Sequence, residues 1–294
     1  MQYDTDAIDK GMNKKLKTFL NRSITYIFLI VGGMTMVLPF LWMLSTSLKS
    51  YSSIFIMNMA QIQWIPNPVY WKNYLDVWKV VPFGRFYLNS IFVVVCVTFG
   101  QVATSSLAAY AFARLKFPGR DKIFFAYLAT MMIPGSVTLI PVFVLMRIFG
   151  WIDTYKALII PAIFSAYGTF LLRQFFMTIP RDLEDAAKID GCSLWGIFRM
   201  VILPLSKTSL ATLTIFVSLG NWVSFMWPLL VTNSIGKKTL PIGLAYFQEL
   251  YQYAQPDWGL LMAGSLVTMV PVIIVFLFNQ RFFVEGIKLT GMKG

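Results

Sequence analysis

The sequence predicts an all-α, polytopic membrane protein with about six transmembrane helices. Two observations lead to this fold class. Hydrophobic residues make up 57% of the 294 residues and charged residues only 13%, whereas a soluble domain is about 45–50% apolar and about 25% charged. In addition, six stretches reach the length of about 20 mostly apolar residues that one helix needs to cross a bilayer. Most of the surface is therefore expected to face lipid.

The predicted spans divide the chain into a transmembrane domain and two tails. The spans cover residues 24–46, 87–112, 123–148, 157–177, 208–231 and 258–279. We expect residues 1–23 to form an N-terminal tail, 24–280 the transmembrane domain and 281–294 a C-terminal tail. One connection, residues 180–207, is too polar to cross the bilayer, because a charged residue at the centre of a membrane costs about 2.5–3.5 kcal/mol.

The distribution of Lys and Arg predicts the orientation, since cytoplasmic loops carry an excess of basic residues. With a cytoplasmic N-terminus, 17 of the 25 basic residues lie inside and eight outside. We therefore expect both termini and residues 180–207 in the cytoplasm, and residues 49–85 and 233–257 outside. The tryptophans of residues 49–85 fit either the membrane interface or a surface that docks an external partner. The 17 are Lys10, Lys14, Lys15, Lys17, Arg22, Arg114, Lys116, Arg120, Lys122, Arg173, Arg181, Lys188, Arg199, Lys207, Arg281, Lys288 and Lys293.

Composition also argues against several function classes. The chain contains no histidine, which removes the commonest general base and metal ligand, and its two cysteines lack the spacing of a metal site or a disulfide framework. It has no G-x-x-x-x-G-K-[ST] phosphate-binding loop. We therefore expect no enzyme activity, metal or cofactor in this chain. The net charge of +12 is scattered among apolar runs, which fits an anionic lipid surface better than a nucleic acid.

Residues 180–207 have the pattern of a helix hairpin. Pro180 suits the first turn of a helix, and Gly191 suits the left-handed position that ends one. Ser193 can cap a second helix, which Pro204 would close. The apolar face of that second helix would consist of Leu194, Trp195, Phe198, Val201 and Ile202. A short amphipathic helix of this kind fits a groove on another protein; an ordinary loop folded against the bundle is the alternative.

The hairpin sequence resembles a known family motif. DAAKIDG (Asp185–Gly191), followed by a further helix and Leu203-Pro204, is similar to the EAA loop of the permease subunits of ABC importers. Asp185 stands where Glu is usual, with Glu184 just before it. In that family the loop forms a coupling helix seated in a cleft of the ATPase subunit. The resemblance therefore implies that ATPase coupling involves Glu184, Asp185, Ala186, Ala187, Asp190, Gly191, Phe198, Leu203 and Pro204.

Further segments extend the resemblance to most of the chain. They are Leu88-Asn89-Ser90, AAYAFARLKFPGR (108–120), TLPIGL (239–244) and QRFFVEGIKLTGMKG (280–294). Together they resemble the maltose-type carbohydrate permeases, specifically the six-helix partner of the pair. Residues 222–225 depart from the Trp-Asn-Glu-Phe that this branch often has. The resemblance implies a sugar importer of the bacterial cytoplasmic (inner) membrane. Its implied partners are a second permease subunit, two ATP-binding-cassette ATPase subunits that bind ATP and Mg, and an extracytoplasmic solute-binding protein.

The fifth predicted span carries polar residues suited to a substrate path. An amide facing lipid is costly, so Asn221 should face either a wet cavity or a neighbouring helix. Hydroxyl, amide and aromatic groups together suit a sugar. The predicted substrate path consists of Asn221, Trp222, Ser224, Trp227 and Tyr167. In the external loop at residues 233–257, the predicted contacts to a binding protein are Tyr251, Gln252, Tyr253 and Gln255, with a plain solvated loop as the alternative.

Two rival classes of protein fit the sequence less well. An ion-driven secondary transporter usually buries ionisable residues at mid-membrane, and none of the six predicted spans has a carboxylate near its centre. A non-transporting scaffold or sensor would leave the hairpin and the proline-bearing helices unexplained.

Overall fold

The computed structural model describes residues 3–51, 54, 64–250 and 257–291. The described residues form helices and connecting loops and no β-strand, as the sequence predicts. The chain separates into two compact units, one of Met1–Asp76 with Asp257–Leu266 and one of Val77–Pro256 with Val267–Gly294.

In the first unit, the main element is the long helix α1, Tyr3–Ser47. Residues 3–23, expected as a tail, continue the same helix as the first span. From Thr18 to Ser47 this helix is long and apolar enough to cross a membrane, and its large apolar side chains are exposed, as a lipid-facing surface requires. Its C-terminal carbonyls are bound by the next helix, α3 (Asn73–Val80), since the Asn73 amide donates to the carbonyls of Ser47 and Lys49 at 2.8 Å each.

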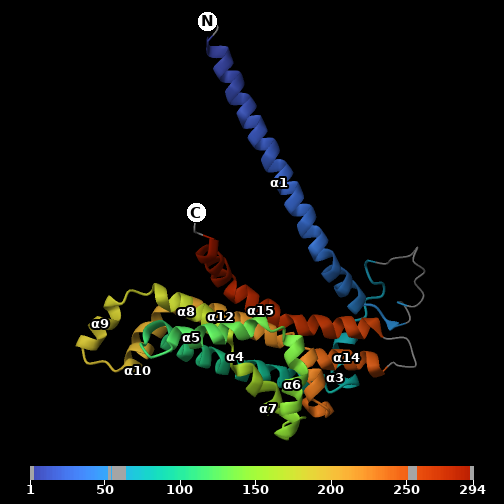
Figure 1. Cartoon of the computed structure of the whole chain (residues 1–294). Coiled ribbons are helices and arrows are strands. Elements are labelled where there is room, and N and C mark those ends of the chain that lie inside the picture. The colour runs from blue at the N-terminus through green and yellow to red at the C-terminus, as the bar shows by residue number, and fades with distance from the viewer. Residues whose placement is uncertain (1–2, 52–53, 55–63, 251–256, 292–294) are drawn as a thin grey trace. The chain divides into compact units, whose positions relative to one another are not determined.

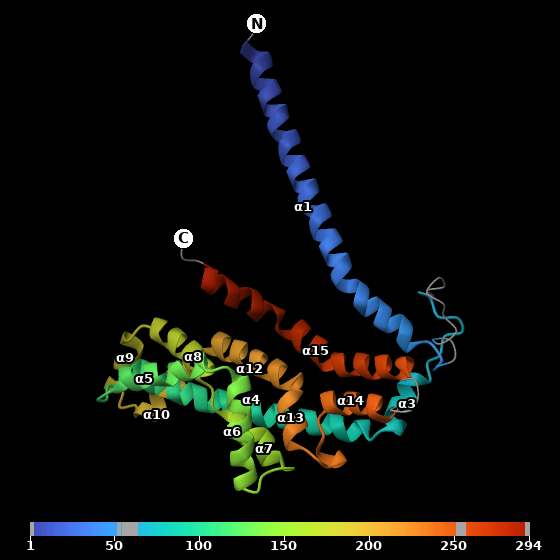
Figure 2. The same ribbon diagram turned by 45° about the vertical axis from the view of Figure 1, so that its right-hand side comes forward.

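In the second unit, the 32-residue helix α4 (Phe83–Arg114) packs along α8 (Ala166–Thr178) and α12 (Lys207–Trp222), as Figures 1 and 2 show. Small residues make the α4–α8 crossing close. A Cβ at Gly168 would lie only 2.6 Å from the Ser105 hydroxyl. Small side chains of this kind let helix backbones approach each other in membrane proteins.

Several spans that the sequence predicts as continuous runs are broken. In the third, α5 (Arg120–Ala129) and the 3-10 turn η1 (Thr130–Met132) meet α6 (Gly135–Ile148) at a bend of 100°. Pro134 lies at this break, where it has no N–H to continue a helix. The fourth span begins with α7 (Tyr155–Ile159) and η2 (Ile160–Ile163) before α8.

The fifth predicted span is interrupted once, and a sharp bend lies just before it. The apolar segment Leu194–Leu205 joins α12 at a bend of 79°. It consists of α10 (Leu194–Ile197), the π-helical turn η3 (Phe198–Ile202) and α11 (Leu203–Leu205). The predicted span 208–231 is interrupted as well, since α12 ends at Trp222 and α13 (Met226–Val231) restarts after three residues.

The remaining described elements complete the unit. They are α9 (Asp182–Ile189), the 3-10 turn η4 (Ile235–Lys237), α14 (Leu240–Leu250) and the last helix α15 (Trp258–Gly291), which belongs to both units. By length and composition the described residues contain four candidate spans without a sharp bend, and up to six if each bent pair counts as one. The prediction of about six transmembrane helices is thus confirmed, with bends that hydropathy did not reveal.

Candidate functional site

The polar segment at residues 180–207 forms the predicted helix hairpin. Gly191 has φ +82°, the left-handed conformation that ends α9, and the N–H of Cys192 donates back to the carbonyl of Ala187 at 2.9 Å. Ser193 caps α10, since its hydroxyl accepts the N–H of Gly196 at 3.1 Å. These two local predictions are confirmed.

The proline predictions for the hairpin are wrong. Pro180 lies before α9 and not in its first turn, because that helix begins at Asp182. Pro204 does not close the second arm, which runs on through α11 to Leu205. Because a proline lacks an N–H and its ring crowds the carbonyl four residues back, the chain before Pro204 widens into the π-helical turn η3, where the N–H of Leu203 donates to the carbonyl of Phe198.

The tip of the hairpin exposes large apolar side chains. Ile189 is 87% exposed and Trp195 is 60% exposed, with Leu183 and Leu194 also on the surface. Of the predicted apolar face of the second arm, Leu194 and Trp195 are exposed, whereas Phe198 and Ile202 are buried and Val201 packs against the core. Contiguous exposed apolar side chains typically mark an interaction site.

The two acidic residues at the start of the EAA-like motif occupy opposite environments. Asp185 is exposed and accepts a 2.8 Å hydrogen bond from Lys188, whose ammonium holds the pKa of Asp185 below its usual value. Glu184 is buried and faces the bundle, where its Oε1 lies 2.9 Å from Nε of Arg114. The N–H of Arg114 is not aligned on this oxygen, so the contact is an ion pair rather than a directed hydrogen bond. Removing one partner from such a buried pair costs about 3–5 kcal/mol.

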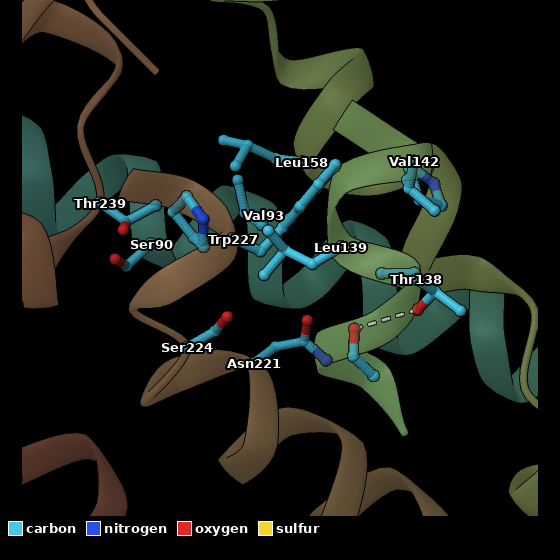
Figure 3. Close-up of a pocket in the computed structure, with 14 residues that line it drawn as sticks. Ser90, Val93, Thr138, Leu139, Val142, Leu158, Asn221, Ser224, Trp227 and Thr239 are labelled. Carbon is cyan, nitrogen blue, oxygen red and sulfur yellow. Dashed lines mark hydrogen bonds between the residues drawn. The ribbon is translucent and has the colours of Figure 1, made fainter. Parts of the chain in front are cut away.

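A pocket of about 330 Å³ lies inside the second unit (Figure 3). Its lining comes from α4, α6, α7, η2, the α12–α13 break and the loop before α14. The residues are Ser90, Val93, Gly135, Thr138, Leu139, Val142, Leu158, Pro161, Ala162, Asn221, Ser224, Trp227, Pro228 and Thr239. None of these has an ionisable side chain.

The broken spans meet at this pocket. Gly135 begins α6 directly after the 100° bend, Pro161 lies in η2, and Ser224 lies in the break between α12 and α13. Non-helical backbone at membrane depth is tolerated only where it is buried in protein or lines a wet cavity. In transporters, discontinuous helices of this kind form substrate sites near the midplane.

The structure brings three of the five predicted substrate-path residues to the pocket. In Figure 3 the side chain of Asn221 extends toward α6, and Ser224 and Trp227 lie on the side of the pocket across from α6. Trp222 points elsewhere, because its indole N–H donates to the carbonyl of Thr268 at 3.1 Å and its ring packs edge-on against Tyr87. Tyr167, on α8, is 44% exposed and does not line the pocket.

Three of the donors around the pocket, those of Thr138, Asn221 and Trp227, are already engaged, whereas the Thr239 hydroxyl and some acceptors are not. The Asn221 amide donates to the carbonyl of Val217 at 2.9 Å, and the Trp227 indole N–H donates to the carbonyl of Ala157 at 2.9 Å. The Asn221 carboxamide oxygen and the buried Thr239 hydroxyl have no hydrogen-bond partner in the described part of the chain. The pocket thus offers neutral acceptors, hydroxyls and an aromatic ring.

Sequence reasoning missed Ser90, Thr138 and Thr239 as pocket residues. Ser90 and Thr239 belong to the segments LNS and TLPIGL, which the structure places together at the pocket rim. The predicted binding-protein contacts Tyr251, Gln252, Tyr253 and Gln255 lie outside the described residues.

Apolar spans that break around a neutral polar pocket, with a polar hairpin carrying an exposed apolar tip, define a multi-span membrane transport protein. Residues 101–288 match the family described as binding-protein-dependent transport system inner membrane component. The chain belongs to this family, which confirms the predicted resemblance. It is accordingly a transport subunit of the inner membrane and not an enzyme.

Individual proteins support this assignment. The arabinooligosaccharides transport system permease protein AraQ of Halalkalibacterium halodurans is 34% identical over 96% of this chain and 100% of its own length. The sn-glycerol-3-phosphate transport system permease protein UgpE of Yersinia pestis is 33% identical over 89% of this chain and 94% of its own. The fold matches a chain in the crystal structure of a bacterial ABC transporter involved in import of the acidic polysaccharide alginate. That match has a TM-score of 0.79 and 22% identity, over 88% of this chain and 95% of that one.

Proposed function

We propose that this chain is one permease subunit of an ATP-driven importer that moves an uncharged sugar or oligosaccharide across the bacterial cytoplasmic membrane. The partners are a second permease subunit, two ATPase subunits that bind ATP and Mg, and a solute-binding protein that delivers the sugar from outside. Both termini and the hairpin lie in the cytoplasm in this proposal, which the excess of Lys and Arg on that side supports.

The pocket at the broken spans is the observation that carries the proposal. A sugar has many hydroxyl donors, which suit the open acceptor of Asn221 and the hydroxyls of Ser224 and Thr239, and its apolar ring face suits Trp227. An anionic solute would be favoured by a cation, and none of the lining residues is cationic. Among the relatives, AraQ is named for arabinooligosaccharides and UgpE for sn-glycerol-3-phosphate; the neutral lining favours the first kind of solute.

The hairpin is the part that we propose to dock on the ATPase. Its exposed apolar residues, Leu183, Ile189, Leu194 and Trp195, would be covered by a groove on that subunit. Asp185 and Ala186 on α9, and Asp190 directly after it, are exposed and would line the contact. Gly191 sets the angle between the arms, while Phe198 is buried at the base of the hairpin.

Transport by the reconstituted complex tests the proposal. The chain would be purified with its partner permease and ATPase subunits, placed in proteoliposomes and supplied with the binding protein from the same system. We expect ATP-dependent uptake of neutral oligosaccharides, and no competition by alginate oligosaccharides or sn-glycerol-3-phosphate. Uptake of an anionic solute in preference to neutral saccharides would contradict the proposed substrate class. Uptake without ATP would contradict the proposed energy source.

A further inference from the structure

Arg114, the last residue of α4, connects three elements of the second unit. Its side chain is only 4% exposed. One terminal nitrogen donates to the carbonyls of Phe176 and Ile179, at the end of α8, and Nε pairs with Glu184 at the start of α9. The last carbonyls of a helix have no partner within the helix, so Arg114 completes the end of α8 while it binds the hairpin.

Glu184 is the inward-facing residue of the first hairpin arm. It is the buried residue among the eight that form α9, and its side chain is 8% exposed. The second arm is held by the same face of α4, one turn earlier. There Tyr110 packs on Phe198, with 5.1 Å between ring centroids, and its hydroxyl lies 3.3 Å from the carbonyl of Leu194. Arg114 and Tyr110 thus fasten the two arms to one helix.

The other end of α4 reaches the pocket. Ser90 and Val93 line the pocket, and Arg114 lies 24 residues after Ser90 on an uninterrupted helix, a length of about 36 Å at 1.5 Å per residue. Unlike the third and fifth spans, α4 has no break between these points. A helix without a break can transmit a displacement along its length.

We propose that the Arg114–Glu184 pair is the link that transmits hairpin movement to α4 and α8. The inference rests on the proposed function, since it assumes that ATPase closure moves the hairpin. The two side chains act as positioning residues within this subunit. Asp185, by contrast, is exposed and would contact the ATPase directly. A buried charge strongly resists losing its partner, so α9 cannot shift without carrying the ends of α4 and α8 with it. Salt bridges and rigid helices are among the elements that carry coupling between distant sites.

The test measures the ratio of ATP hydrolysed to solute imported, in proteoliposomes that contain the whole complex and the binding protein. Glu184→Gln keeps the shape of the side chain but removes its charge. We expect this variant to assemble and to hydrolyse ATP within about twofold of the wild-type rate, while uptake falls about tenfold, so that the ratio rises about tenfold. Asp182→Asn, on the exposed first turn of the same helix, is the matched control and should keep the wild-type ratio.

Other results with Glu184→Gln would overturn the proposed link. A wild-type ratio in Glu184→Gln, or hydrolysis and uptake that fall together, would show a purely structural pair and overturn the inference. If Glu184→Gln fails to assemble, Arg114→Lys decides instead, because it keeps the charge but lacks the fork that spans Glu184 and both carbonyls. A ratio at least twofold above wild type then supports the link, and a wild-type ratio overturns it. The wild-type arm tests the proposed function separately, since it shows whether ATP drives uptake and of which solute.

Discussion

The hydroxyl of Ser90 accepts a hydrogen bond from the backbone N–H of Leu240 at 2.8 Å, across 150 residues of sequence. The neighbouring Asn89 donates to the carbonyls of Gly236 and Lys238 and accepts from the hydroxyl of Tyr155. These bonds fasten the start of α4 to the loop before α14 and to α7. The segments LNS and TLPIGL, far apart in the chain, are thus joined by hydrogen bonding beside the pocket.

Removing the Ser90 hydroxyl should destabilise this contact between the start of α4 and the start of α14. In Ser90→Ala the buried N–H of Leu240 loses its acceptor, and a buried unsatisfied donor costs about 1–3 kcal/mol. We expect a lower midpoint of thermal unfolding for the purified subunit in detergent. Thr214→Val is the control, because that hydroxyl bonds only to the carbonyl of Leu210 on its own helix and is exposed. Equal unfolding midpoints for Ser90→Ala and wild type would contradict the role of this bond.

Substitution of Gly191 should impair coupling in proportion to backbone strain. A Cβ there would meet no atom within 4 Å, so the cost comes only from the left-handed φ of +82°, about 1–2 kcal/mol for a residue with a Cβ. Gly191→Val, which is β-branched and stiffer, should hurt more than Gly191→Ala. We expect the Val variant to reach the membrane with its partner yet to lose sugar uptake and substrate-stimulated ATP hydrolysis together. Wild-type transport by Gly191→Val would show that the hairpin is not the joint.

Asn221→Leu should weaken transport while the complex still assembles. The substitution removes the open carboxamide acceptor from the pocket but keeps a side chain of similar size. One hydrogen bond is worth about 0.5–1.5 kcal/mol, so uptake at limiting sugar should fall by up to about tenfold. Thr214→Val, on the same helix and outside this pocket, serves again as the control. Unchanged uptake, or loss of assembly, would instead assign Asn221 to helix packing.

Cysteine labelling should show the hairpin and the loop before α14 on opposite sides of the membrane. The native Cys96 and Cys192 are both free and would first be replaced by serine. Single cysteines would then be placed at the exposed positions 188 and 233. With an impermeant thiol reagent on intact cells whose outer membrane is permeabilised, we expect labelling at 233 and none at 188. The reverse pattern would invert the predicted topology.

Acid should loosen the contact between Asp153 and residues 233–237. Burial opposes ionisation of Asp153, but hydrogen bonds from Ser234 and Asn233 and the charge of Lys237 outweigh it, so its pKa lies below its usual value. A lowered pKa in the folded state stabilises the fold above the unfolded-state value, about 3.9. That contribution is lost as pH falls through the folded-state pKa. Asp153→Asn should therefore show a smaller loss of thermal stability than wild type between neutral pH and about pH 3.5, measured in detergent.

The number of spans could be predicted from sequence, but their bends could not. Hydropathy depends on side-chain transfer energy, and the residues at the breaks, Ile133-Pro134 and 223–225, are as apolar or neutral as their surroundings. A change in the direction of the helix axis therefore does not alter the hydropathy profile. Pro134-Gly135 was the available signal, since proline disfavours a continuing helix.

The turn and cap of the hairpin depend on residues close together in the sequence, whereas the pocket depends on residues from distant segments. Gly191 and Ser193 act through their own backbone and near neighbours, so sequence pattern sufficed. The inward turn of Glu184 depends on Arg114, at the end of another helix, and no local pattern reports that pair. Likewise, the cost of an amide in lipid pointed to Asn221, whereas Ser90 and Thr239 join it only through the packing of three elements.

The neutral lining of the pocket has an electrical consequence. A unit charge carried across a membrane potential of 100 mV exchanges about 2.3 kcal/mol with the field. None of the pocket's lining residues is ionisable, so a rearrangement of this lining moves no fixed charge through the field, and an uncharged solute adds none. Membrane voltage should then neither drive nor brake this step. Vesicles with and without an imposed potential are expected to import the solute at the same rate when their ATP supply is equal.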